Sequence, residues 1–114
     1  MFKNFKKSNQ YKKRVHKYIV GGAHTYSKGD DQFPKLSPSA ISRGKGAHIW
    51  DIDNNKYIDC ALGLGSVSIG HSEPEINKEI IKEAKKGTNF QRPSYIELET
   101  ARSFLSILPG MNLV

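Results

Sequence analysis

Two closely spaced turn signals in residues 39–60 constrain the fold of this chain more than any other feature. Residues 48–52 and 56–59 alternate apolar with polar side chains, and Asp53-Asn54-Asn55 separates the two runs. The glycines at Gly44 and Gly46 mark an earlier turn. Alternation with a period of two, interrupted by Gly, Asn and Asp, is typical of antiparallel strands joined by short turns. Residues 39–60 therefore predict a β-meander with one half-buried face.

Three helices are expected around this meander. Residues 4–19 carry apolar side chains at helical spacings with Lys on the other faces, and Gly21-Gly22 is a usual stop signal. Ser72 and Ser94 each begin a capping-box sequence, with Glu three residues later and apolar positions at helical spacing beyond it. Residues 23–38 show no periodicity and should form a loop. The fold class indicated is α+β: an N-terminal helix, a short antiparallel meander and two helices.

The last residues begin a pattern that they do not complete. Met111 to Val114 are mostly apolar and follow the stop signal Pro109-Gly110. We interpret them as the start of a strand at which a longer domain has been cut, because a small sheet needs a partner to cover it. The alternative is a short final strand that pairs back onto the meander.

The net charge of +7 comes from the start of the chain. Residues 1–18 contain seven Lys and Arg and no acidic residue, and the rest of the chain is formally neutral. A localised basic helix is usually a solvated face, and Lys does not alternate with aromatic residues as in RNA-binding proteins. We therefore expect no nucleic-acid partner. A small basic module that binds an anionic surface, either nucleic acid or acidic lipid, stays as an alternative, and a ligand-free structural domain is a third.

The sequence also bears on the compartment. There is no apolar core of a signal peptide and no stretch long enough to span a bilayer, so we expect a cytoplasmic protein without a membrane partner. The single Cys60 excludes an internal disulfide.

No catalytic or metal-binding constellation can be assembled from these residues. The four His lie on different predicted elements and are expected to be surface or capping residues. Asp51 and Asp53 flank a turn, where Asp is common for local hydrogen bonding. The stretch Gly63-Leu64-Gly65-Ser66 could bring backbone N–H groups toward an anion, but it lacks the Lys-Ser/Thr ending of a nucleotide phosphate loop. We assign no catalytic, cofactor-binding or metal-binding residue.

Four stretches, in this order, resemble the front of class III pyridoxal phosphate (PLP) aminotransferases. Residues 20–28 lie where glutamate-1-semialdehyde aminomutases have a Gly-Gly loop that reaches the substrate. Residues 43–59 are similar to the family's meander, G-x-x-x-W-D-x-D-G-x-x-Y-I-D. Residues 65–74, with Gly70-His71, are similar to its G-H-x-x-P passage into a helix, and residues 87–90 to a loop near the active site. The likeness runs from about residue 8 to the end of the chain.

The resemblance implies the N-terminal part of a fold type I PLP-dependent transferase, in a full-length homodimer with PLP as cofactor. Residues 1–22 would be an N-terminal basic helix, residues 23–70 the substrate loop and meander of the N-terminal lobe, and residues 71–114 the helical start of the large PLP domain. In such chains the phosphate loop, the Asp beside the pyridine nitrogen and the Schiff-base Lys all come later. No Lys here is therefore expected to be catalytic, and the chain alone should be inactive.

Three residues align with substrate-side positions of the aminomutases. Thr25 lies where they have a Ser in the substrate pocket, Lys28 where an Arg grips the substrate carboxylate, and Leu64 where a Trp lies over the substrate. Lys offers a point charge and not the bidentate fork of Arg, so Lys28 is equally compatible with an exposed loop lysine. These departures favour an aminotransferase relative, and the wording of residues 23–31 resembles relatives from polysaccharide and nucleotide-sugar pathways. The partners implied are a small-molecule amino donor and acceptor, with transfer or 2,1-migration of the amino group.

Overall fold

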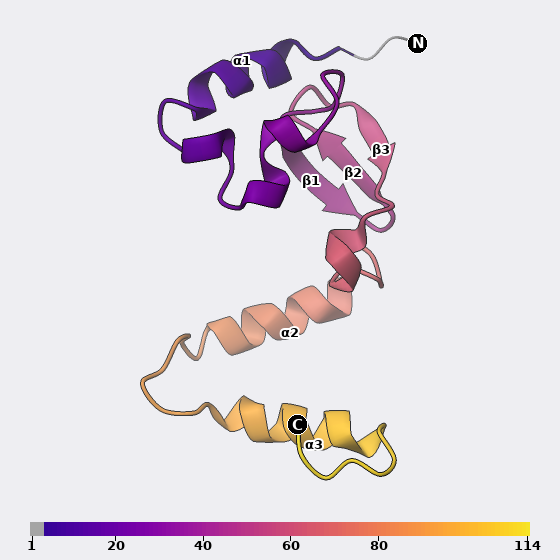
Figure 1. Cartoon of the computed structure of the whole chain (residues 1–114). Coiled ribbons are helices and arrows are strands. Elements are labelled where there is room, and N and C mark those ends of the chain that lie inside the picture. Colours follow the sequence, from indigo (N-terminus) through magenta and orange to yellow (C-terminus); the bar gives the residue numbers. More distant parts are fainter. Residues whose placement is uncertain (1–3) are drawn as a thin grey trace. The chain divides into compact units, whose positions relative to one another are not determined.

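The computed structural model describes residues 4–114, which form two compact units that divide after Asn77 (Figure 1). Residues 1–3, including Lys3 of the expected basic segment, lie outside the described residues. The first unit contains one helix, a three-stranded sheet and several short 3-10 turns. The second unit contains the end of one helix and the whole of the next.

Helix α1 spans Lys6–Val15 and is shorter than the sequence predicts. The expected end near residue 19 is wrong, because the amides of Lys17 and Tyr18 bond to carbonyls only three residues earlier and tighten the chain into a turn. The two glycines then take left-handed conformations and change the chain direction, with φ of 70° at Gly21 and 74° at Gly22. The predicted stop signal thus acts after the helix and not at its end.

The predicted meander is confirmed. Strands β1 (Ile41–Lys45), β2 (His48–Asp51) and β3 (Lys56–Ile58) form one antiparallel sheet in the order β1-β2-β3. Gly46 and Asn54 lie in the two connecting turns with φ of 55° and 66°, and Asn is among the few residues that tolerate this left-handed region. The guanidinium of Arg43 lies 3.7 Å from the centre of the Trp50 ring and covers it.

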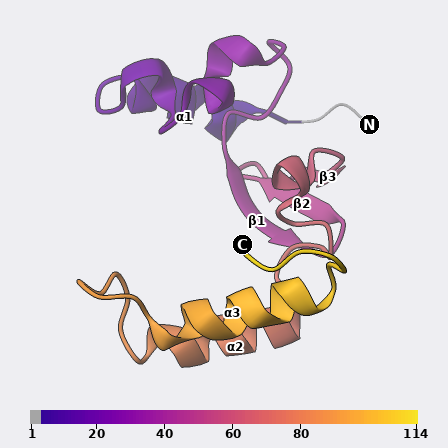
Figure 2. The ribbon, with the colours of Figure 1, turned by 60° about the horizontal axis from the view of Figure 1, so that its bottom comes forward.

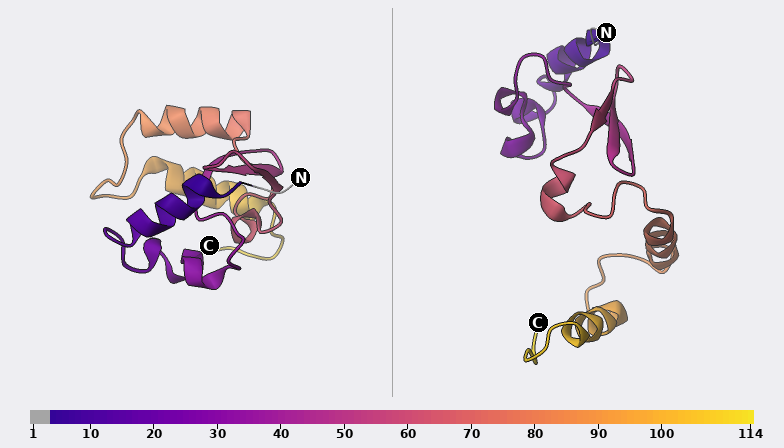
Figure 3. Two further views of the ribbon diagram at one scale, coloured as in Figure 1. Left: turned by 90° about the horizontal axis from the view of Figure 1, so that it is seen from above. Right: turned by 90° about the vertical axis from the view of Figure 1, so that its right-hand side faces the viewer.

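The two turns of the meander fasten different segments to the sheet. In the β2–β3 turn, the carboxylate of Asp53 accepts hydrogen bonds from the amides of Lys7 and Ser8, each at 2.7 Å, and so caps the start of α1. In the β1–β2 turn, Gly46 exchanges two backbone hydrogen bonds with His71, at 2.8 Å and 2.9 Å. Figure 3 shows α1 and the segment that follows β3 near opposite ends of the sheet.

Between α1 and the sheet lie three 3-10 turns, two of them within the loop expected for residues 23–38 and one just before it. They are η1 (Val20–Gly22), η2 (Tyr26–Lys28) and η3 (Asp30–Gln32). The carboxylate of Asp30 holds this loop to α1, since it contacts Lys12 Nζ at 3.2 Å and His16 Nε2 at 3.0 Å. The loop is therefore attached to the helix that precedes it.

After the sheet come the turn η4 (Leu62–Gly65), helix α2 (Pro74–Ala84) and helix α3 (Tyr95–Ser106). The capping box at Ser94 is confirmed, with Glu97 Oε1 accepting from the Ser94 amide at 2.7 Å. The capping box predicted at Ser72 is wrong. The Ser72 hydroxyl donates to the Gly44 carbonyl at 3.0 Å, and the carboxylate of Glu73 accepts from the Ile76 amide instead.

In the second unit, α2 and α3 are joined by residues 85–94 and run in opposite directions (Figures 1 and 2). Their apolar side chains are largely exposed, including those of Ile80, Leu98 and Phe104. Residues 111–114 form no strand, so the expected final strand is absent from the described structure. Within residues 4–114 only one hydrophobic residue, Val15, is buried. The apolar faces of the two helices are therefore left uncovered by the described residues.

Candidate functional site

Two of the three candidate substrate residues share one turn. Thr25 is extended, with φ of −137°, and its carbonyl accepts a hydrogen bond from the Lys28 amide at 3.1 Å. Both side chains are exposed, because η2 presents them on the outside of the loop. The backbones of Thr25 and Lys28 are therefore joined in one turn, and both side chains are accessible to a ligand.

The loop that carries these two residues is anchored at its two ends. At one end a Cβ on Gly22 would lie 3.0 Å from His16 Nε2, so the loop backbone passes directly over the His16 ring. At the other end Asp30 binds that same nitrogen. The hydrogen bond from His16 is the main cause that lowers the pKa of Asp30; burial opposes it, and Lys12 acts in the same direction as His16. The loop is thus fastened to α1 by one charged cluster.

The third candidate, Leu64, lies on the left-handed turn η4. Leu62, Gly63, Leu64 and Gly65 follow one another with φ of 49°, 57°, 57° and 94°. The left-handed region costs an L-residue about 1–2 kcal/mol, so the two leucines hold the turn in a strained form. The Leu64 side chain is 98% exposed and gains nothing from burial that would offset this cost. Other contacts must therefore hold the turn in place.

Carbonyl groups of η4 accept short hydrogen bonds from two serine hydroxyls that follow the turn. The Ser66 hydroxyl donates to the Gly63 carbonyl at 2.7 Å, and the Ser68 hydroxyl donates to the Gly65 carbonyl at 2.6 Å. The amides of Leu64 and Ser66 bond to the carbonyls of Ala61 and Gly63. Two of the N–H groups that the sequence suggested for an anion are therefore engaged within the loop.

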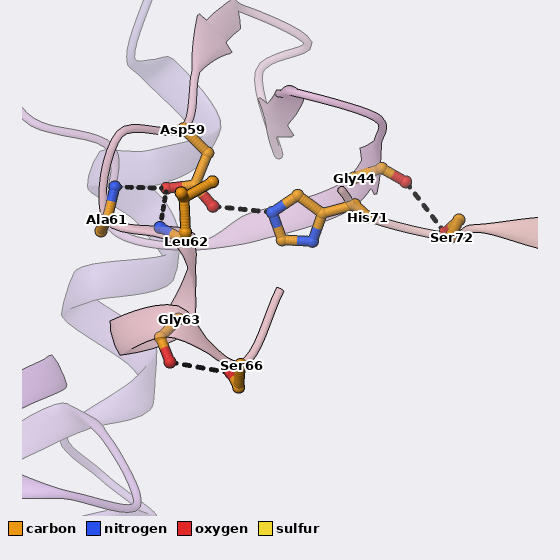
Figure 4. Close-up of polar contacts among 8 residues, drawn as sticks. All are labelled: Gly44, Asp59, Ala61, Leu62, Gly63, Ser66, His71 and Ser72. Atoms are coloured by element: carbon orange, nitrogen blue, oxygen red, sulfur yellow. Dashed lines mark hydrogen bonds and ion pairs between the residues drawn. The ribbon is translucent and has the colours of Figure 1, made fainter. Parts of the chain in front are cut away.

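Asp59, at the end of β3, holds the entry to this turn (Figure 4). Its Oδ1 accepts hydrogen bonds from the amides of Ala61 and Leu62, at 3.0 Å and 3.1 Å. Its Oδ2 lies 2.7 Å from Nε2 of His71, twelve residues later in the chain. The segment between Asp59 and His71 is thereby closed into a loop by a side-chain pair at its base.

His71 is fixed on its other side by the sheet. A Cβ on Gly44 would lie 2.5 Å from His71 Cγ, so only glycine fits on β1 at this point. The backbone of His71 pairs with Gly46, and Ser72 bonds to the Gly44 carbonyl. The sequence predicted a surface or capping role for each His, and this is wrong for His71, whose side chain is 24% exposed and is hydrogen-bonded to Asp59.

The charge of this pair favours the ionised form of Asp59. The hydrogen bond from His71 is the main cause that lowers the Asp59 pKa, and the amides of Leu62 and Ala61 act in the same direction against the effect of burial. The folded state therefore keeps Asp59 ionised to lower pH than the unfolded chain does. The stabilisation is present above the ordinary Asp pKa of 3.8 and is lost as the pH falls through the lowered value.

The structure joins Thr25 to Lys28 but places Leu64 on a different turn. The loop that carries Thr25 is tied to α1, and α1 is capped from the β2–β3 turn. The loop that carries Leu64 is tied to His71, which pairs with the β1–β2 turn at the other end of β2. Asp59 and His71 were not predicted as site residues. Asp59 is nevertheless the last residue of the meander motif, and His71 lies in the G-H-x-x-P motif.

Every lysine within residues 4–114 has an exposed side chain. In the same residues, no group of three or more His, Cys, Asp or Glu is placed to hold a metal ion. No helix in the described part of the chain is long and apolar enough to cross a membrane.

Comparison with solved structures shows the same fold in parts of three larger proteins. An omega-transaminase from Sphaerobacter thermophilus is 23% identical, with a TM-score of 0.79 over 93% of this chain. A glutamate-1-semialdehyde aminomutase from Pseudomonas aeruginosa is 24% identical, with a TM-score of 0.77 over 90%. The PLP form of the FumI protein from a Sphingopyxis species is 24% identical, with a TM-score of 0.83 over 95%.

The chain spans only 23%, 22% and 26% of the lengths of these three proteins. Its fold is that of the N-terminal part of a fold type I PLP-dependent transferase, as the resemblance implied. The family model for class-III aminotransferases matches residues 26–112, which include the meander, η4, α2 and α3. The chain therefore belongs to the class III aminotransferases, a family of PLP-dependent enzymes.

Proposed function

We propose that this chain is the N-terminal portion of a PLP-dependent transaminase or 2,1-aminomutase and supplies substrate-side residues to it. The family match over residues 26–112 is the observation that carries the proposal. The division of labour follows the resemblance: residues 1–22 as a basic helix, 23–70 as the lobe that carries the substrate residues, and 71–114 as the start of the PLP domain. PLP, when bound, provides the electron sink for amino-group chemistry.

The exposed residues on η2 and η4 supply complementary chemistry for a small amino substrate. Lys28 offers a cation for a carboxylate, and Thr25 a hydroxyl that donates or accepts one hydrogen bond. Leu64 offers an apolar surface. Its side chain is exposed, so burial of Leu64 does not stabilise the strained turn that carries it. Together they would bind and orient a substrate, while proton movement and the attachment of the cofactor fall to residues beyond Val114.

One further feature supports a larger body around these residues. The apolar faces of α2 and α3 are exposed in the described structure, and a PLP domain built on them would cover them. From the family resemblance and the sequence, we also propose that the full enzyme is a cytoplasmic homodimer and that the chain alone is inactive. The alternative of a basic module that binds an anionic surface has less support, because Asp30 already pairs with Lys12 on α1.

The proposal is tested on the protein encoded by the open reading frame that continues past Val114. Purified with PLP, it should show the visible absorption band of protein-bound cofactor and lose it when an amino donor converts the cofactor to its amine form. A well-folded protein without this band overturns the proposal.

The role of Lys28 has its own test in the same enzyme. Lys28→Ala should raise KM for a carboxylate-bearing substrate, whereas Lys28→Arg should retain or lower it, since the guanidinium binds a carboxylate with two hydrogen bonds. Lys35→Ala is the matched control, because Lys35 is an exposed lysine a few residues further along the chain. Equal KM values for Lys28→Ala, Lys35→Ala and the wild type would exclude Lys28 from the substrate site.

A further inference from the structure

We propose that Asp59 and His71 are positioning residues, which lock the η4 turn and thereby set where the Leu64 side chain points. The part of this inference that concerns substrate rests on the proposed function. The part that concerns the turn rests on the described contacts alone. Neither residue is placed in contact with a substrate, so both act through Leu64.

The first step is that Asp59 uses both carboxylate oxygens on the same loop. Oδ1 receives the amides of Ala61 and Leu62, which are the first two N–H groups of the turn. Oδ2 faces His71 Nε2 at 2.7 Å. One carboxylate therefore joins the start of the loop to its end, as the dashed lines in Figure 4 show.

The second step concerns the strain in the turn. Leu62 and Leu64 both have left-handed backbones, and such conformations persist only where the surroundings over-determine them. The serine hydroxyls bond the turn to itself, but only Asp59 connects it to the sheet through side-chain hydrogen bonds at its entry. Without Asp59, the two leucines are free to relax toward right-handed conformations, and the Leu64 side chain then moves with its backbone.

The third step is that His71 is a rigid anchor. Its backbone is paired with Gly46, and its ring lies against Gly44 so closely that a Cβ there would sit 2.5 Å from Cγ. The backbone of β1 thereby sets the position of the His71 ring, and the ring sets the position of the Asp59 carboxylate. The chain of contacts runs from β1 through His71 and Asp59 to η4.

The first experiment measures the turn in the full-length protein, without substrate. Amide hydrogen exchange by NMR should be slow at Ala61 and Leu62, and faster by about tenfold or more in Asp59→Ala, since these amides then lose their acceptor. His48→Gln, on β2, is the control and should leave both rates unchanged. Unchanged rates in Asp59→Ala would overturn the proposal.

The variant Asp59→Asn adds a test that a merely structural role would not pass. Its Oδ1 can still accept the two amides, which leaves the NH2 group facing His71 Nε2. An NH2 donor requires a neutral imidazole with a free Nε2 lone pair, whereas the natural carboxylate accepts from both neutral and protonated His71. Acidification that protonates His71 should therefore release the two amides in Asp59→Asn and not in the wild type. The same pH response in both proteins would overturn the pairing.

The second experiment tests the link to Leu64 in the full-length enzyme by a double-mutant cycle. His71→Ala should lower kcat/KM by about tenfold or more, because small displacements of a positioning group are costly. His71→Gln, whose side-chain amide can still donate to Asp59, should recover part of the loss. In a Leu64→Ala background, His71→Ala should cost nothing further, because its effect passes through Leu64.

The outcomes separate the inference from the proposed function. Additive losses from His71→Ala and Leu64→Ala would overturn positioning through Leu64. Gly44→Ala is a second route to the same result, since it displaces His71 without changing any charge, and it should lower kcat/KM in the wild-type background only. A wild-type enzyme without transamination would sink the proposed function and the substrate role together, while the exchange rates still decide the role of Asp59 in the turn.

Discussion

Replacing Asp51 with Ala tests how much of the meander depends on one buried carboxylate. Asp51 is 1% exposed at the end of β2. Its Oδ1 accepts from the amides of Asp53 and Asn55, at 3.0 Å and 2.8 Å. Its Oδ2 accepts from Asn55 Nδ2 at 2.8 Å and from the Tyr57 hydroxyl at 2.9 Å. The substitution removes the acceptor of four hydrogen bonds at once.

The expected loss follows from the kind of donor. A hydrogen bond to a charged group contributes about 1.5–3 kcal/mol. Some of the freed donors lie on a surface turn and can bond to water, so we expect Asp51→Ala to lower the free energy of unfolding by about 3–5 kcal/mol in total. That is a large share of the roughly 5–15 kcal/mol typical of a domain. Urea unfolding of the chain measures the loss.

The variant Asp51→Asn is the matched control. It keeps the size of the side chain and the acceptor Oδ1, but its NH2 group faces the donors of Asn55 and Tyr57. The Tyr57 hydroxyl can rotate to accept, so the expected loss is only about 1–2 kcal/mol. If Asp51→Ala costs less than about 1 kcal/mol, the four hydrogen bonds do not stabilise the meander and the reasoning fails.

Tyr57 provides an independent readout of the same network. Burial, together with the hydrogen bond to Asp51, raises the pKa of Tyr57 to about 12. Because the folded pKa is raised, the stabilisation is complete below the unfolded value of 10.0 and is lost as the pH rises from there toward 12. In an ultraviolet titration of the tyrosines, Asp51→Ala should bring Tyr57 back toward 10.0, and an unchanged titration would contradict the assignment.

Three other changes test how the remaining segments are held. Asp53→Ala should expose the first amides of α1 to exchange while the last turn keeps its protection, as NMR exchange can show. Gly22→Ala should destabilise the chain more than Gly21→Ala, because both force a left-handed alanine at about 1–2 kcal/mol but only Gly22 lies against His16; equal urea midpoints would contradict this. The Asp30 carboxyl should titrate below its ordinary pKa of 3.8, and His16→Ala should move that titration upward in carbon-detected NMR.

The meander was predictable because its signals are local. Each turn needs a residue that accepts a left-handed backbone, and Gly46 and Asn54 supply it within a few residues of the strands they connect. At the position of Asn54 the family pattern has Gly. The left-handed φ of 66° explains why Asn can take the place of Gly there. Such turn chemistry is visible in the sequence without knowledge of any distant contact.

Ser72 shows where local rules fail. Its sequence context fits a capping box as well as that of Ser94 does, and only Ser94 forms one. The difference lies in the backbone: Ser72 has φ of 54°, outside the extended conformation of an N-cap, and its hydroxyl donates to the carbonyl of Gly44, 28 residues earlier in the chain. Helix α2 begins at Pro74, and the carboxylate of Glu73 accepts from the Ile76 amide. No window of local sequence contains the contact with Gly44.

The candidate site combines both situations. Thr25 and Lys28 are neighbours in one turn, so their proximity was within reach of local reasoning. The pair of Asp59 and His71 depends on the pairing of His71 with Gly46 in the β1–β2 turn and on its close approach to Gly44. Only the fold reveals these contacts. The sequence could place Gly70-His71 in the family's G-H-x-x-P passage, but it could not say which group the imidazole binds.

The contacts that fix η4 all lie within the first compact unit. Asp59, His71 and the glycine that admits the imidazole precede residue 77, and the turn they hold is closed by its own serines. The orientation of Leu64 is therefore encoded in this unit, independently of α3 and of anything beyond Val114. This unit does not supply a partner for the Leu64 side chain, because the side chain is exposed here. A turn that bears strain to display an apolar side chain is explained most directly if another molecule or a later part of the enzyme covers that side chain.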